Sequence, residues 1–170
     1  MGKEEQTSSW LAQLLDDHGG ALVLYARQWC DCPEDVVQEA LLELVSQPRM
    51  PTHVVAWLYR VVRNEAISVA RKHRRREQRE QQVATSEAWF SPNQGPLESQ
   101  EAAEALADLP IELREVIVAR IWGNLTFAEI AEIMGTSLST AQRRYEQGIQ
   151  ALQTRLEKPC TTNDRREKTN

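Results

Sequence analysis

LTFAEIAEIMGTSLSTAQRRYEQGIQALQTRL, residues 125–156, predicts two helices joined by a tight turn. Thr126 is suited to cap the first helix, because Glu129 stands three residues later, as in a capping box. Gly135 then permits the backbone conformation of a sharp turn. A second helix follows the polar stretch TSLS, with Ala141 first in its apolar stripe. This order of features is typical of a helix-turn-helix, and a plain helical hairpin is the alternative.

The second of these helices begins with polar and basic side chains. In a helix-turn-helix, side chains at such positions reach base edges and phosphates of duplex DNA. The candidate duplex-binding residues are Ser137, Ser139, Thr140, Gln142, Arg143 and Arg144.

AWLYRVVRNEAISVARKHRRREQRE, residues 56–80, predicts a long helix with one apolar and one basic side. The apolar side consists of Val54, Val55, Leu58, Val61, Val62, Ala66 and Val69. The arginines on the other side are Arg60, Arg63, Arg71 and Arg74. Trp57 and Tyr59 fall on the flanks, and Glu65 is the one misfit in the apolar arc. Residues 49–79 carry nine basic and two acidic side chains, although the chain has a net charge of −5, so a local basic surface is expected.

Helical periodicity covers most of the chain, and no alternating strand pattern appears. One helix is expected through residues 8–29, with an interruption at Gly19 and Gly20 left open. The next is expected from Pro33 to about Ser46. Its predicted buried residues are Val37, Ala40, Leu41, Leu44 and Val45. The predicted fold is all-α, with two small helical domains and a flexible linker. The expected divisions are a first domain at 8–80, the linker at 81–99, a helix-turn-helix domain at 100–157 and a disordered tail at 158–170.

Several classes of function lack support in the sequence. Cys30 and Cys32 are not accompanied by zinc-ligand spacing, so neither a metal site nor a cofactor is expected. There is no phosphate-binding glycine loop and no nucleophile with a partnered histidine, which argues against an enzyme. No apolar run is long enough for a membrane span, and the N-terminus lacks signal-peptide features. A cytoplasmic protein without membrane insertion is therefore expected.

Taken in order, these pieces resemble an extracytoplasmic-function (ECF) sigma factor of bacterial RNA polymerase, a sigma-70 family member with regions 2 and 4 only. The matching stretches are YARQW, PEDVVQEALLELV, AWLYRVVRNEAI, LADLPIELREVIVAR and the helix-turn-helix. The resemblance covers about residues 12–76 and 100–157. It implies a role in promoter recognition and transcription initiation, with core RNA polymerase and promoter DNA as partners. An anti-sigma factor is a further partner that the resemblance leaves open.

The resemblance also implies a role for three sets of residues. In the family, the helix holding an acidic, glutamine-containing pattern binds the clamp helices of core polymerase. The matching residues, with an exposed leucine beside them, are Asp35, Gln38, Glu39 and Leu42. The basic helix and the loop before it engage the minus-ten promoter element and help to separate the strands. The residues matched to that role are Arg49, Thr52, His53, Trp57, Arg60, Arg63, Asn64 and Arg71. The helix-turn-helix residues are matched to the minus-thirty-five element.

The chain departs from the family pattern at two places. Its recognition helix has Ala141 and Gln142 where members commonly have Val-Lys, and Tyr145 where they have Leu. The loop at residues 47–53 is shorter than usual. Two other functions remain open on the sequence. One is a helix-turn-helix regulator that binds DNA without polymerase, and the other is an interaction protein whose second domain has lost DNA binding.

Overall fold

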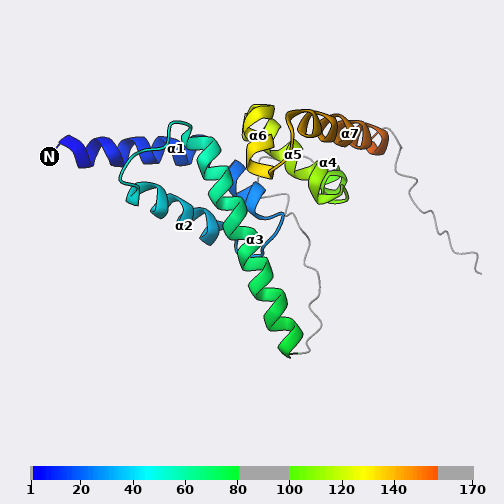
Figure 1. Cartoon of the computed structure of the whole chain (residues 1–170), viewed down its shortest axis with the longest axis horizontal. Helices are drawn as coiled ribbons and strands as arrows, with labels where there is room; N and C mark the ends of the chain where they lie inside the picture. The colour runs from blue at the N-terminus through cyan, green and yellow to red at the C-terminus, as the bar shows by residue number, and fades with distance from the viewer. Residues whose placement is uncertain (1, 81–99, 157–170) are drawn as a thin grey trace, which may run out of the picture.

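The computed structural model describes residues 2–80 and 100–156, and their regular secondary structure is entirely helical (Figure 1). The predicted all-α fold is confirmed. The seven helices are α1 (Gly2–Ala26), α2 (Pro33–Ser46), α3 (Val54–Glu80), α4 (Gln100–Ala107), α5 (Ile111–Ile121), α6 (Phe127–Met134) and α7 (Leu138–Leu156). The predicted linker and tail lie outside the described residues. Within the described ranges, no helix has the length and apolar character needed to cross a bilayer.

Helices α1, α2 and α3 form the first group, in which each helix packs against the other two. Its core contains Leu22, Leu44, Leu58 and Val62, all nearly inaccessible to solvent. The interruption left open at Gly19 and Gly20 is absent, because α1 is a single helix. A helical glycine costs only about 1 kcal/mol relative to alanine, and burial of the residues that follow outweighs that cost.

Helix α2 begins at Pro33, as predicted. The prediction that Val45 belongs to its buried stripe was wrong. Val45 is 43% exposed, whereas Val36 is buried. A helix advances about 100° per residue, so Val36 lies nearer than Val45 to the centre of the stripe formed by Val37, Ala40 and Leu44.

Helices α4 to α7 form the second group, in which α7 packs against the other three. Thr126 caps α6 through a capping box, with Glu129 accepting a hydrogen bond from the Thr126 backbone N–H at 2.8 Å. Gly135 ends α6 in the left-handed conformation, at φ 63°. Both helix-turn-helix signals in the sequence are therefore confirmed. Buried Gly148 lets α7 approach α5 closely, since a Cβ there would lie 2.6 Å from Ile117 Cδ1.

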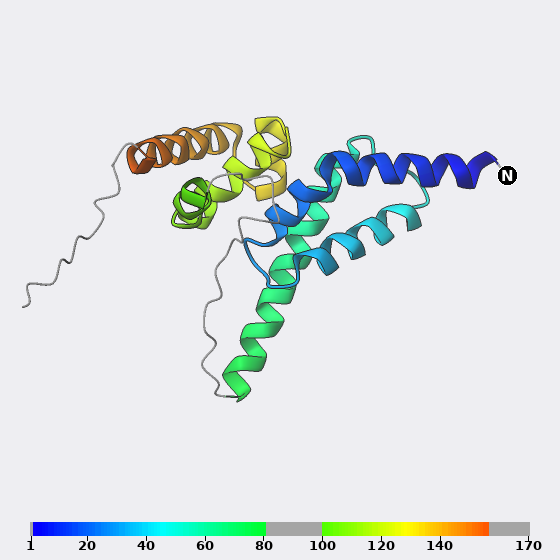
Figure 2. The same ribbon diagram turned by 180° about the vertical axis from the view of Figure 1, so that it is seen from behind.

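The two groups of helices are in contact with each other. Helix α1 packs against α5, and α3 packs against α6. Figures 1 and 2 show the second group beside the N-terminal half of α3, while the C-terminal half of α3 extends away from both groups. The N-terminal half of α3 is therefore the part of the basic helix that the second group can cover.

Candidate nucleic-acid interface

The N-terminal end of α3 and the loop before it face α6 across a cavity of about 220 Å³. Four residues matched to the minus-ten element line this cavity: Thr52, His53, Trp57 and Arg60. The opposite wall consists of Glu129, Glu132 and Ile133 of α6.

One ion pair and one histidine–carboxylate contact cross this boundary. Arg60 Nη1 lies 3.1 Å from Glu132 Oε1, and His53 Nδ1 lies 3.8 Å from Glu129 Oε1. Burial acts to raise the pKa of Glu129, but hydrogen bonds from Thr126 and the charge of His53 outweigh it and lower that pKa. The α6 wall therefore presents carboxylates to side chains that the sequence matched to the minus-ten element.

Arg63 lies deeper between the two groups than the sequence predicts. Its Nε donates to Glu115 Oε1 at 2.5 Å, and the same oxygen accepts a hydrogen bond from the Tyr25 hydroxyl at 2.7 Å. The Arg63 guanidinium also stacks over Trp29, 5.9 Å from the ring centroid. Burial tends to lower the pKa of Arg63, and the hydrogen bond and charge of Glu115 reverse that effect and raise it. The Arg63 side chain is only 23% exposed, and its charge is paired with a carboxylate of the second group.

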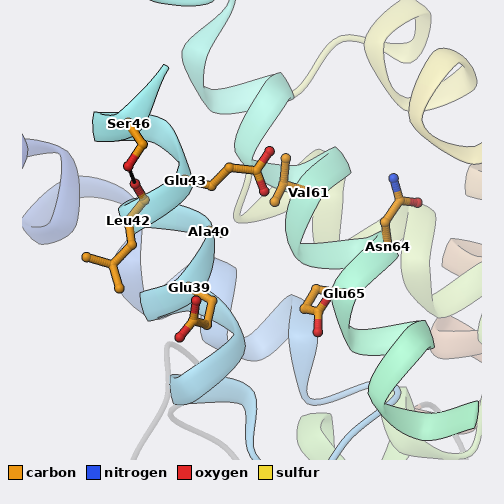
Figure 3. A pocket seen from close by; sticks show the side chains of 8 residues that line it. All are labelled: Glu39, Ala40, Leu42, Glu43, Ser46, Val61, Asn64 and Glu65. Carbon is orange, nitrogen blue, oxygen red and sulfur yellow. Dashed lines mark hydrogen bonds between the residues drawn. The ribbon is translucent and has the colours of Figure 1, made fainter. Parts of the chain in front are cut away.

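The other residues matched to the minus-ten element are dispersed. Asn64 is exposed on α3 and borders a groove of about 650 Å³ that Glu39, Glu43 and Glu65 also line (Figure 3). Arg71 is exposed further along α3, and Arg49 is exposed in the loop after α2. The structure thus gathers four of the eight residues at α6 and leaves Arg49, Arg63, Asn64 and Arg71 elsewhere.

The outer face of α2 carries the residues matched to polymerase binding. Asp35, Gln38 and Glu39 are exposed, and Leu42 is 52% exposed among them. In Figure 3, Leu42 and Ser46 project away from α3, whereas Glu43 extends toward it. An exposed leucine bordered by carboxylates has the apolar centre and charged rim of a protein interface.

The residues matched to the minus-thirty-five element lie together at the start of α7. Gln142 and Arg143 are exposed, and Arg144 is half-buried. Ser137 Oγ accepts a hydrogen bond from the Thr140 backbone N–H at 3.2 Å and bonds the Ser139 hydroxyl at 3.1 Å. Ser137 therefore caps α7, a structural role that its position just before the helix explains.

Glu115, Tyr25 and Tyr59 were not among the sequence candidates. Glu115 is only 3% exposed. Its position at the start of the apolar stretch EVIVA was the feature of the sequence that could have indicated this burial. Tyr59 was expected on a flank of its helix but is completely buried. Its ring packs on Tyr25, with centroids 4.7 Å apart, and burial raises its pKa. These three residues form part of the contact between the two groups.

Two family comparisons match separate parts of the chain. Residues 14–76 match the family described as Sigma-70 region 2. Residues 99–152 match the family described as Sigma-70, region 4. The RNA polymerase sigma factor SigV of Bacillus subtilis is 26% identical over 164 residues, covering 93% of this chain and 98% of SigV. The ECF RNA polymerase sigma factor SigL of Mycobacterium tuberculosis is 30% identical over 172 residues, covering 92% of this chain and 94% of SigL.

Solved structures give the same result for the fold. The sigma factor RpoE of Bartonella quintana, in complex with the anti-sigma factor NepR, has a TM-score of 0.74 and 26% identity, covering 91% of this chain and 99% of RpoE. CnrH, in complex with the cytosolic domain of CnrY, has a TM-score of 0.53 and 24% identity, covering 86% of this chain and 87% of CnrH, and supports the fold alone. The matches to both regions and the near full-length relatives show that this chain belongs to the ECF sigma factors, which direct promoter recognition by RNA polymerase.

Proposed function

We propose that this sigma factor binds core RNA polymerase through the outer face of α2. The observation that carries the proposal is the exposed Leu42, with Asp35, Gln38 and Glu39 on the same face. A large apolar side chain left in solvent beside carboxylates suits a partner with an apolar patch and basic surroundings. The helical core does not need these side chains, since α2 packs through Val37, Ala40 and Leu44, among others.

Helix α3 and the loop before it form the proposed contact with the minus-ten element. Strand separation leaves unstacked bases and a single-stranded backbone, which aromatic and basic side chains bind respectively. Trp57 and Arg60 lie about one helical turn apart on α3 and line the same cavity, so they can act on neighbouring nucleotides.

The start of α7 forms the proposed contact with the minus-thirty-five element in duplex DNA. Gln142 and Arg143 are exposed at the first turns, where a recognition helix meets base edges and phosphates. Glutamine and arginine side chains make bidentate contacts with adenine and guanine respectively.

The proposal includes a cytoplasmic location, where the polymerase acts, and no catalytic role for the chain itself. It also includes an anti-sigma partner, by extension from the Bartonella quintana complex. The test is in-vitro transcription with core polymerase and genomic DNA fragments. RNA that starts at defined sites only when the chain is added is the expected result. Tight operator binding by the chain alone, with no such RNA, would instead favour a polymerase-independent regulator.

A further inference from the structure

Two cysteines, Cys30 and Cys32, lie in the short connection between α1 and α2. Both are free thiols, and the proposed function gives neither of them a role. The backbone N–H of Cys32 donates a hydrogen bond to Cys30 Sγ, and the two thiols are also in hydrogen-bond contact with each other. The two sulfur atoms therefore lie side by side in the reduced protein.

The backbone between the two cysteines suits a disulfide. Residues two apart are separated by at most about 7 Å in a fully extended chain. The Cα atoms of a disulfide lie within about 7 Å of each other. The chain bends at Asp31, which shortens the separation, and residues 30–32 belong to no helix. The Cys32 side chain makes no capping hydrogen bond to α2, so its sulfur can move without loss of a helix cap.

The two thiols differ in their access to solvent. Cys30 is 6% exposed within the core, and its Sγ donates to the Ala26 carbonyl oxygen at 3.6 Å. Burial raises the pKa of Cys30 to about 11, so this thiol is protonated at neutral pH. Cys32 is partly exposed. Because thiol–disulfide exchange requires access of the thiol to its target, a disulfide reagent in solution reacts first at Cys32.

We propose that Cys30 and Cys32 form a thiol pair that closes reversibly to an intramolecular disulfide when the protein meets a low-molecular-weight disulfide. Cys32 attacks one sulfur of the reagent and forms a mixed disulfide, and the first reagent thiol leaves with the Cys32 proton. Cys30 then attacks the Cys32 sulfur, and the second reagent thiol leaves with the Cys30 proton. Each closure oxidises two protein thiols and reduces one reagent disulfide to two thiols.

The same short connection makes the disulfide easy to reduce. Only one residue separates the two cysteines, and departures from preferred disulfide geometry store strain that makes the bond more reducible. Strained disulfides have higher reduction potentials than structural ones, and they are the labile, regulatory or catalytic class. Disulfides in the cytoplasm, the location proposed for this protein, are usually transient. The pair is therefore a modification site and not a structural crosslink.

Glutathione buffers test this site in the full-length chain with Cys160→Ser, because that substitution removes the third thiol of the sequence. The protein is equilibrated with oxidised or reduced glutathione, quenched with acid and alkylated with N-ethylmaleimide in denaturant. Mass spectrometry counts the maleimide adducts and detects attached glutathione. The matched control adds Cys32→Ser, which removes the partly exposed thiol and keeps Cys30 in the core.

The chain with both cysteines should carry two maleimide adducts after excess reduced glutathione and none after excess oxidised glutathione, with no glutathione attached. Return to reduced glutathione should restore both adducts. The Cys32→Ser control should keep its one adduct in both buffers, because Cys30 is buried and has no partner thiol.

Three results would overturn the closure: adducts that persist in oxidised glutathione, a glutathione that stays attached, or a disulfide that joins two chains. A disulfide that reduced glutathione does not open would overturn its reversibility. Loss of the adduct from the Cys32→Ser control would overturn Cys32 as the first thiol to react. Circular dichroism checks the helices of both proteins, and Cys32→Ala replaces Cys32→Ser if the latter loses them.

Discussion

Tyr59 of α3 packs against the backbone of Gly123, two residues after the end of α5, and no side chain at position 123 could fit between them. A Cβ added at Gly123 would lie 2.5 Å from the Ala119 carbonyl oxygen as well as 2.7 Å from Tyr59 Cζ. The close packing of the two groups at this point therefore requires a residue without a Cβ at position 123.

Gly123→Ala should weaken the contact between the two groups. Forcing an added methyl group into a packed site costs about 1–3 kcal/mol, which should appear as a lower melting temperature. Gly20→Ala is the control, since a Cβ at that helical glycine would meet nothing within 4 Å. It should leave stability unchanged or raise it by about 1 kcal/mol, because alanine favours helix. Calorimetry compares the two variants, and equal melting temperatures would contradict the packing described for Tyr59.

Thr126→Ala should destabilise the helix-turn-helix. The substitution removes the side chain that accepts the Glu129 backbone N–H at 3.2 Å, and loss of such a cap costs about 1 kcal/mol. Thr154→Ala is the control, because that exposed hydroxyl bonds the Gln150 carbonyl within α7 and caps no helix start. Urea unfolding measures both. A Thr126→Ala variant as stable as Thr154→Ala would show that the capping box contributes little.

The same capping box predicts a dependence of stability on acid pH. The folded state lowers the pKa of Glu129 from its ordinary value of 4.5. Its contribution is therefore complete above that value and is lost as pH falls through the lower, folded pKa. Urea unfolding at several acid pH values should show a smaller loss of stability on acidification in Glu129→Gln than in the wild type. Equal losses in the two proteins would contradict the lowered pKa.

The alkaline titration of tyrosine should report the burial of Tyr25 and Tyr59. Burial first, and then the charge of Glu115, raises the pKa of Tyr25 well above 10, and burial raises the pKa of Tyr59. Their contribution to stability is present below the unfolded value and is lost as pH rises through the folded pKa. Ultraviolet difference absorbance should therefore show that Tyr25 and Tyr59 ionise only as the protein unfolds. Ionisation of Tyr25 and Tyr59 while the protein is still folded would contradict their burial.

Local signals predicted the second group of helices well. Thr126, Glu129 and Gly135 act within a few residues of one another, so their spacing alone predicted the cap and the turn. Such local signals could not predict the contacts between the two groups of helices. Glu115 lies 52 residues from Arg63 and 90 from Tyr25, and helical periodicity carries no information about such pairs.

Tyr59 illustrates the same limit at a single position. The sequence pattern of α3 placed Tyr59 on a flank of the helix. Periodicity identifies the main apolar face of a helix, but it does not show whether a second group of helices covers another side. A second surface covers that flank, and Tyr59 is buried there against Tyr25 and Gly123. The roles of the predicted DNA and polymerase residues are matters of partner binding, and they remain predictions.

Trp57→Ala should impair promoter opening more than recruitment of polymerase to the promoter, because stacking on Trp57 begins only after the strands separate. Base stacking on an aromatic side chain is worth about 1–3 kcal/mol, enough to reduce the open fraction clearly. Permanganate reactivity of promoter thymines measures opening, and a gel-shift assay measures recruitment. Trp10→Ala, at a partly exposed position of α1, is the control. Normal opening by Trp57→Ala would remove this residue from the minus-ten surface.

The central claim is that α2 binds polymerase while α7 reads the promoter, and binding of two double variants to core RNA polymerase tests it most directly. Asp35→Arg with Glu39→Arg should abolish capture by core polymerase, because like charges at an interface cost several kcal/mol, while exposure of both side chains preserves the fold. Arg143→Ala with Arg144→Ala should keep capture and lose promoter-dependent RNA. Normal capture of the Asp35→Arg, Glu39→Arg protein, with its helicity intact, would contradict the account.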